Sequence, residues 1–415
     1  AKLSMGMAAF NNAAENAETG IDCLPADRWE RHREVCHGLY TIAAEAFRLT
    51  GDIKRMEKYC NELLSAESDR PLEEKFQVYY TLAVGLFYGA DRYAEGKQII
   101  LDLLKHLNCR FPKNSTTTVS KTIFNILNLV LTKKRRTAKE LAKMELMTDP
   151  IKIESMKLLD KLAEICYATK DELLLPLVIF RALDYTIRCG VSVYSPRLVA
   201  SVSIIFSGVL NDLQGAALYA NFALRLMKKV NHRPIESGTI LFSFIVGIHW
   251  TIPVQDCLTP LMNAYNIGMN TGEIENTLWC VFLHLFFPFQ AGKPLNVIEV
   301  DLAIYIPPME ERSQHIIADW SKLLLRVVQG LMGQSRDHER LRESGKENSD
   351  NPFLKQLRAG YDRVERGYYG DNEQCAESAL KFGNGLQKAI PGSPFAAVDM
   401  FVSALSCYVM ARRTG

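Results

Sequence analysis

The side chains that could do chemistry are scattered along this chain rather than gathered into a motif. None of the eight histidines falls in the His-Glu-x-x-His spacing that presents two zinc ligands on one helix face. His249 and His284 stand in apolar segments, where we expect histidines that are satisfied within the core. The spacing therefore predicts no metal site, and it assigns no histidine a catalytic role. The histidines are His32, His37, His106, His232, His249, His284, His315 and His338.

No segment has the spacing of a loop that binds the phosphates of a nucleotide. Gly345 and Lys346 are followed by Glu347, and the first glycine of a P-loop is missing. Residues 383–385 (Gly-Asn-Gly) begin a dinucleotide-like pattern, but Lys388 replaces its third glycine and a helix is expected before it. The kinase motifs are absent as well. We therefore predict no cofactor and no catalytic residue.

The cysteines and the paired acidic residues have simple structural interpretations. No two of the ten cysteines form Cys-x-x-Cys, and Cys36, Cys60 and Cys166 fall on apolar helical positions. This pattern predicts reduced core cysteines of a cytosolic protein rather than a disulfide framework or a zinc site. The acidic pairs 73–74 and 310–311 are predicted to be solvated helix starts rather than acid–base pairs.

One run of charge is a candidate partner-binding site. It consists of four consecutive cations, Lys133, Lys134, Arg135 and Arg136. Three interpretations stay open: a solvated loop, a docking patch for an acidic or phosphorylated partner, and a localisation signal. A threonine stands on each side of the run, so phosphorylation there could reverse the local charge.

The totals limit the class of protein. The 49 basic and 47 acidic residues leave a net charge of +2, which argues against a dedicated nucleic-acid binder. The most apolar stretches, 240–252 and 278–289, are shorter than the about 20 residues that a membrane-spanning helix needs, so we expect core helices. No signal peptide is recognisable. We expect a cytoplasmic protein without nucleic-acid or membrane partners. The first residue, Ala1, suggests that the chain was cut from a longer protein.

The elements that must position these residues are helices. From Cys36 to Phe47 apolar residues recur with the period of one helix face, and a second stripe follows Gly51 and Asp52. A similar turn occurs 38 positions later, at Gly89, and others follow along the chain. One such pair cannot cover its own apolar face, so pairs must stack. The pattern predicts an all-α fold of stacked antiparallel helix pairs, a tetratricopeptide-like α-solenoid.

Three segments interrupt the helical pattern, at 105–118, 131–138 and 334–352, and the last is rich in charge, serine and asparagine. They suggest a division into N-terminal helical repeats (1–130), central helical repeats (139–333), a flexible connection (334–352) and C-terminal helical repeats (353–415).

Several short segments, taken in order and spacing over residues 20–290, resemble one family. They are Asp22-Cys23-Leu24-Pro25 with Trp29, residues 43–47 with the Thr-Gly-Asp turn at 50–52, Tyr93, Leu103-Leu104, Phe111-Pro112, Leu146-Met147-Thr148-Asp149-Pro150, Tyr194-Ser195-Pro196, Trp250-Thr251-Ile252-Pro253 and Thr271-Gly272-Glu273. They resemble the helical, tetratricopeptide-like region that follows an AAA-type ATPase module in large predicted-ATPase signalling proteins. That family includes multi-sensor serine/threonine and histidine kinases and ATPases related to the origin recognition complex.

The resemblance implies a non-catalytic scaffold or regulatory segment of an ATPase- or kinase-containing signalling protein. Its partner would be another protein or the neighbouring ATPase module of the same polypeptide. The same residues also allow a stand-alone tetratricopeptide-like adaptor, and, less favoured, an all-α enzyme whose catalytic groups meet only in space. The coding sequence upstream of residue 1 separates the first two, since a P-loop there supports the scaffold and a stop codon the adaptor.

Overall fold

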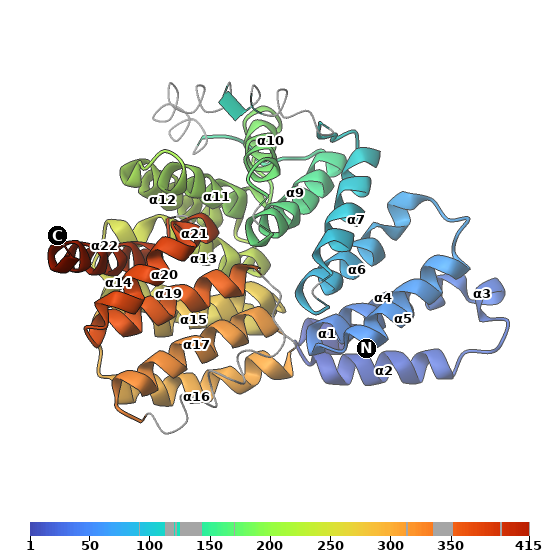
Figure 1. Ribbon diagram of the computed structural model, residues 1–415. Coiled ribbons are helices and arrows are strands. Elements are labelled where there is room, and N and C mark those ends of the chain that lie inside the picture. The colour runs from blue at the N-terminus through green and yellow to red at the C-terminus, as the bar shows by residue number, and fades with distance from the viewer. Residues whose placement is uncertain are drawn as a thin grey trace.

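The computed structural model of this protein describes residues 1–90, 92–112, 120, 123–124, 143–169, 171–312, 314–334, 352–390 and 392–414. Within these residues every regular element is a helix, and the one β-type contact is an isolated bridge between Leu146 and Val191. Most helices pack against the helix that follows them in sequence (Figure 1). The predicted all-α fold of stacked helix pairs is therefore confirmed.

The N-terminal helices form two consecutive pairs with additional short helices. The α4·α5 and α6·α7 pairs make the main contacts, and α2 covers α4. The elements are α1 (Lys2–Gly6), α2 (Phe10–Asp22), α3 (Arg28–Arg31), α4 (Arg33–Thr50), α5 (Ile53–Ala66), the 3-10 helix η1 (Leu72–Lys75), α6 (Phe76–Tyr88) and α7 (Tyr93–His106).

The central helices continue the array. They are α9 (Pro150–Ala168), α10 (Leu174–Cys189), α11 (Ser195–Gly208), α12 (Leu213–Val230), η2 (Arg233–Ile235), α13 (Glu236–Val246), η3 (Ile248–Trp250), α14 (Val254–Thr271), α15 (Ile274–Gln290), α16 (Leu295–Glu311) and α17 (His315–Leu331). The C-terminal helices α19 (Pro352–Tyr368), α20 (Asn372–Phe382), α21 (Gly385–Ala389) and α22 (Pro394–Thr414) pack onto α17 through α19.

The turn between α4 and α5 shows how the sequence sets these pairs. Gly51 has φ +85°, the left-handed conformation that ends a helix and that glycine adopts without a steric cost. The carboxylate of Asp52 then accepts the backbone N–H of Arg55 at 3.0 Å and caps α5. Asp149 caps α9 in the same way, with Pro150 in its first turn. An aspartate side chain therefore caps the start of each of these two helices.

The apolar stretches predicted to be core helices are buried. Residues 240–252 form most of α13 and the 3-10 turn η3, and residues 278–289 lie in α15, where nearly every side chain is inaccessible to solvent. All ten cysteines are free, and seven of them are buried, as expected. Among the described residues one helical segment, Pro394–Arg413, is long and apolar enough to cross a membrane, judged by length and composition, and 22% of its apolar window is buried.

The two acidic pairs differ. Residues 73–74 lie in the first turn of η1 and are exposed, as predicted. Residues 310–311 are exposed too, but they end α16, so the prediction of a helix start is wrong for this pair. The helix continues through Pro307 and Pro308, and the ammonium group of Lys322 on α17 offsets the charge of Glu310 at 2.5 Å.

The array curls until its beginning contacts its middle (Figure 1). A Cβ at Gly51, after α4, would lie 2.9 Å from the carbonyl carbon of Arg312, directly after α16. The ring of Phe10 on α2 packs against Gly272, between α14 and α15, where a Cβ would lie 3.1 Å from it. These contacts join helices more than 200 positions apart in sequence. The proposed segment borders at 131–138 and 334–352 fall almost entirely outside the described residues, so the division into segments stays a prediction.

Candidate functional site: a buried ionic cluster

A group of eight ionisable side chains lies where the first helices meet the middle of the chain. We call it the ionic cluster. Its members are Glu45, Arg48, Asp160, Lys161, Glu164, Arg197, Glu273 and Glu275, and they come from α4, α9, α11, α15 and the turn before α15. Charged side chains are rarely buried unless they are paired, so such a concentration requires a physical account.

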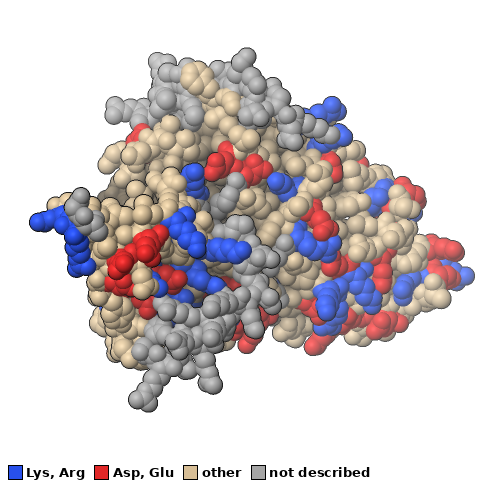
Figure 2. Space-filling model, viewed as in Figure 1, with Lys and Arg blue, Asp and Glu red and all other residues tan. Residues whose placement is uncertain are grey.

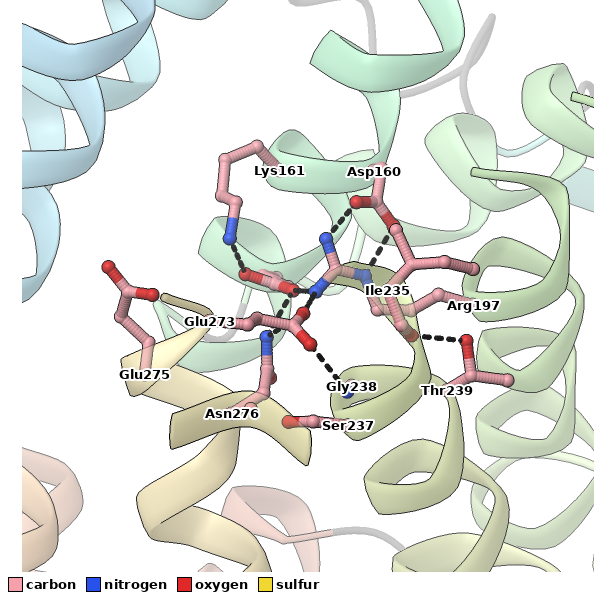
Figure 3. A network of polar contacts seen from close by, with 12 residues as sticks. Asp160, Lys161, Arg197, Ile235, Ser237, Gly238, Thr239, Glu273, Glu275 and Asn276 are labelled. Atoms are coloured by element: carbon pink, nitrogen blue, oxygen red, sulfur yellow. Dashed lines mark hydrogen bonds and ion pairs between the residues drawn. The ribbon is translucent and has the colours of Figure 1, made fainter. Parts of the chain in front are cut away.

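Arg197 is the centre of the cluster (Figure 3). Its guanidinium group forms a two-pronged ion pair with Asp160, in which Nε donates to Oδ1 at 2.7 Å. Its Nη1 group lies 2.6 Å from Oε1 of Glu164 and also donates to Glu273. Only 5% of the Arg197 side chain is exposed. A planar guanidinium group can serve three carboxylates at once, whereas an ammonium group offers no such fork.

Helix α9 supplies the carboxylates on one side of Arg197. Glu164 lies four positions after Asp160 and three after Lys161, so on the helix surface it is a neighbour of both. The Lys161 ammonium group lies 2.7 Å from Oε2 of Glu164, and the hydroxyl of Tyr88 on α6 donates to the same oxygen. Asn276 donates to Oε1 at 3.1 Å. Glu164 therefore has partners on three other helices, α6, α11 and α15, besides Lys161 on its own helix.

The turn before α15 supplies Glu273 on the other side. Its Oε2 accepts the backbone N–H of Gly238 at 3.1 Å, and its Oε1 accepts from Asn276 at 3.1 Å. Gly238 is needed here because a Cβ at this position would lie 2.6 Å from Nη1 of Arg197. A close backbone approach thus lets α13 contribute a hydrogen bond to the cluster (Figure 3).

Arg48 and Glu275 extend the cluster to the N-terminal helices. Arg48 on α4 donates to Glu275 on α15, and its Nη2 lies 2.8 Å from Oε1 of Glu45. Thr81 on α6 donates to the other oxygen of Glu45 at 2.8 Å. In Figure 3 the Glu275 carboxylate points away from Arg197 toward the N-terminal helices. The cluster therefore spans the contact that closes the array.

Carboxylates outnumber cations in the cluster by five to three, and their pKa values separate accordingly. Burial raises the pKa of Glu164, but the charges of Arg197 and Lys161 outweigh burial and lower it to about 2. Burial also raises the pKa of Glu273, here to about 7, against the opposing effect of Arg197. Burial also raises the pKa of Asp160, and Glu273 is thus a carboxyl group of the cluster with a pKa near neutral pH.

The hydrogen-bond and ion-pair partners of these groups determine what the cluster can do chemically. Both oxygens of Glu273 already accept hydrogen bonds from the protein, and Asp160 is held on both oxygens by Arg197. The arrangement holds helices together and leaves Glu273 as a proton acceptor inside the fold. A surface hollow of 680 Å³ lies elsewhere, at the α4–α5 and α6–α7 turns, and residues lining it include Asp52, Lys54, Glu57 and Arg92.

Among the residues that the structure describes, those singled out from the sequence for their chemistry are not members of this cluster. The basic run Lys133–Lys134–Arg135–Arg136 and the Gly345–Lys346 pair lie outside the described residues. Residues 383–384 form the turn after α20, as expected after a helix, and Gly385 begins α21. His249 is buried: its Nδ1 lies 2.6 Å from the Phe244 carbonyl oxygen, and burial lowers its pKa to about 4. His284 Nδ1 similarly lies 3.1 Å from the Leu258 carbonyl oxygen.

Sequence reasoning missed the ionic cluster, although one signal was present. Arg197 follows Pro196 at the start of a helix whose next ten positions hold no other charged residue. A lone cation in such a helix indicates buried carboxylate partners. The identity of those partners could not be read, because Asp160 and Glu273 lie 37 and 76 positions away.

Comparison of the chain with protein-family models, with curated proteins and with solved structures finds no match.

Replacing Arg197 by Met should lower the free energy of unfolding by about 3–5 kcal/mol, because Asp160, Glu164 and Glu273 would stay buried with too few cations. Urea denaturation measures the loss. Arg31→Met is the matched control, since Arg31 pairs with Asp27 at the surface and such pairs contribute at most about 1 kcal/mol. Equal losses in both variants would refute the role given to Arg197.

Replacing Glu273 by Gln should change the pH dependence of stability. The pKa of Glu273 in the folded protein, about 7, lies above its ordinary value of 4.5, so the folded state binds more protons than the unfolded state between these values. The contribution of Glu273 to stability is therefore full at low pH and falls as the pH rises toward 7. The wild-type stability minus that of the variant should decline over this window in urea denaturation, while the same difference for the exposed Glu311→Gln stays flat. A flat difference for Glu273→Gln would contradict the assignment.

Proposed function

We propose that this chain is a non-catalytic helical-repeat scaffold, a regulatory segment of an AAA-type ATPase or kinase signalling protein that contacts a protein partner or the neighbouring ATPase module. The observation that carries the proposal is that the charged groups of the buried ionic cluster pair with one another between helices. Its charged groups hold α4, α9, α11 and α15 in one arrangement. Groups of this kind in an enzyme would face a substrate cavity.

The resemblance in sequence supports the signalling context. Its segments coincide with caps and turns that set the helix pairs, such as Gly51 with Asp52, Asp149 with Pro150, and Gly272 with Glu273. These residues account for a shared architecture. They carry no chemistry of their own, so the ATPase association rests on their order and spacing along the chain.

The surface also suits a scaffold. On the face shown in Figure 2, basic and acidic side chains are interspersed rather than gathered into one patch of a single sign. Such a surface favours contacts of defined shape over attraction to a polyanion. The hollow at the α4–α5 and α6–α7 turns is a place where a peptide with both charges would fit, because Asp52, Lys54, Glu57 and Arg92 line it.

Nucleotide titration and affinity capture test the proposal together. Calorimetry of the chain with Mg-ATP should show no binding in the micromolar range, because the sequence has no phosphate-binding loop. Capture from the native source, with quantitative mass spectrometry, should recover an AAA-type ATPase module, on the same polypeptide or a separate one. Changing Lys133, Lys134, Arg135 and Arg136 to Ser should reduce that recovery if the run is the docking patch.

Each result has a definite meaning. Micromolar ATP binding would overturn the non-nucleotide role. Failure to recover any ATPase module would remove the ATPase association and favour the stand-alone adaptor. Unchanged recovery with the four-serine variant would exclude the basic run as the docking patch while leaving the scaffold intact.

A further inference from the structure

The last helix of the chain has an apolar face that no other described element covers. In Figure 1 α22 lies at the edge of the molecule, with the C-terminus at its outer end. Four large apolar side chains on it are 48–68% exposed: Met400, Phe401, Leu405 and Tyr408. Contiguous exposed apolar patches mark interaction sites, whereas apolar side chains exposed singly are normal on a protein surface.

The exposed residues of α22 form one continuous stripe. Ala397, Ala404 and Ala411 are exposed and lie seven positions apart, and the four large side chains stand between them. Apolar residues repeated at this spacing form the seam between two packed helices. Alanine at every seventh position allows the two backbones to approach closely. The stripe therefore has the geometry of a helix–helix contact.

The opposite face of α22 is already occupied. Phe395 is fully buried with its ring centroid 4.3 Å from that of Tyr361. Asp399 forms a buried two-pronged ion pair with Arg363 on α19, with both donor–acceptor distances 2.7 Å. Insertion of α22 across a membrane would break this pair and expose Arg363, so the length and apolar character of the helix do not favour a membrane span.

The stripe is symmetric about Ala404. Met400 and Tyr408 lie four positions before and after Ala404. Ala397 and Ala411 lie seven positions before and after it. A two-fold interface must be complementary to itself. An antiparallel partner centred on Ala404 places Ala404 opposite Ala404, Met400 opposite Tyr408, and Ala397 opposite Ala411. We propose that α22 binds α22 of a second copy of this chain in this antiparallel arrangement.

The charges favour the antiparallel arrangement over the parallel one. Between residues 395 and 411 the one charged residue is the paired Asp399, and Arg412 and Arg413 follow. A parallel pair would place these cations side by side. An antiparallel pair places them at opposite ends of the contact, about 24 Å apart along the helix axis. That separation exceeds the about 8 Å over which charges act at physiological salt.

Sedimentation velocity of the full chain over a range of concentrations tests the proposal. The wild type should shift from monomer to dimer as concentration rises, because one helix face buries less area than a permanent dimer requires. Ala404→Glu should abolish the shift, since it sets two carboxylates against each other at the symmetry axis. Ala94→Glu on α7, also an exposed alanine, is the matched control and should dimerise like the wild type. Circular dichroism of both variants confirms that they fold.

Cysteine crosslinking tests the register. Under mild oxidation Ala404→Cys should form a disulfide-linked dimer, whereas Ala397→Cys alone should not exceed the wild-type background and should need Ala411→Cys on the other copy. A wild type that stays monomeric, an Ala404→Glu variant that dimerises normally, or equal crosslinking of Ala404→Cys and Ala397→Cys would each overturn the proposal. A monomer that instead binds lipid vesicles through Ala404-centred contacts would assign the stripe to a membrane surface and overturn it too.

Discussion

The packing of the helices depends on neutralising the charge of Arg197, which is buried in the protein interior. An unpaired cation there would be strongly unfavourable, and Asp160, Glu164 and Glu273 supply the opposing charges from two different parts of the chain. Because Asp160 and Glu164 lie on α9 and Glu273 lies in the turn before α15, satisfying Arg197 on α11 requires that these three elements take one relative position. The pairing thus specifies the packing, whatever its net contribution to stability.

The ionic cluster also lies where three apolar cores meet. One core holds α2, α4 and α5, a second holds α6, α7 and α9, and the third holds α11 to α17 with the C-terminal helices. Arg48 belongs to the first group of helices, Glu164 to the second, and Arg197 and Glu275 to the third. In an open stack each helix pair contacts only its neighbours. Here polar contacts across 227 positions, between Arg48 and Glu275, join the first pairs to the middle of the array.

The sequence predicted the local structure well because local structure depends on local signals. The helix stripes, the left-handed Gly51 and the capping Asp52 and Asp149 all act within a few residues of themselves. The acidic pair 310–311 was predicted to be a solvated helix start, but the structure continues α16 through Pro307 and Pro308 and ends the helix at this pair. The ionic cluster escaped prediction for a different reason. Asp160, Lys161 and Glu164 have the pattern of a solvated helix face, and only the tertiary fold buries it against α6 and α11.

The scaffold account requires that the three cores behave as one cooperative unit. Native-state hydrogen exchange followed by mass spectrometry, over a series of low denaturant concentrations, measures this directly. The account predicts that interior amides of α4, α9, α11 and α15 exchange through a single opening with the same free energy and the same dependence on denaturant. If α4 and α5 instead open separately, at a much lower free energy than α9 and α11, the ionic cluster does not join the N-terminal helices to the rest, and the account is contradicted.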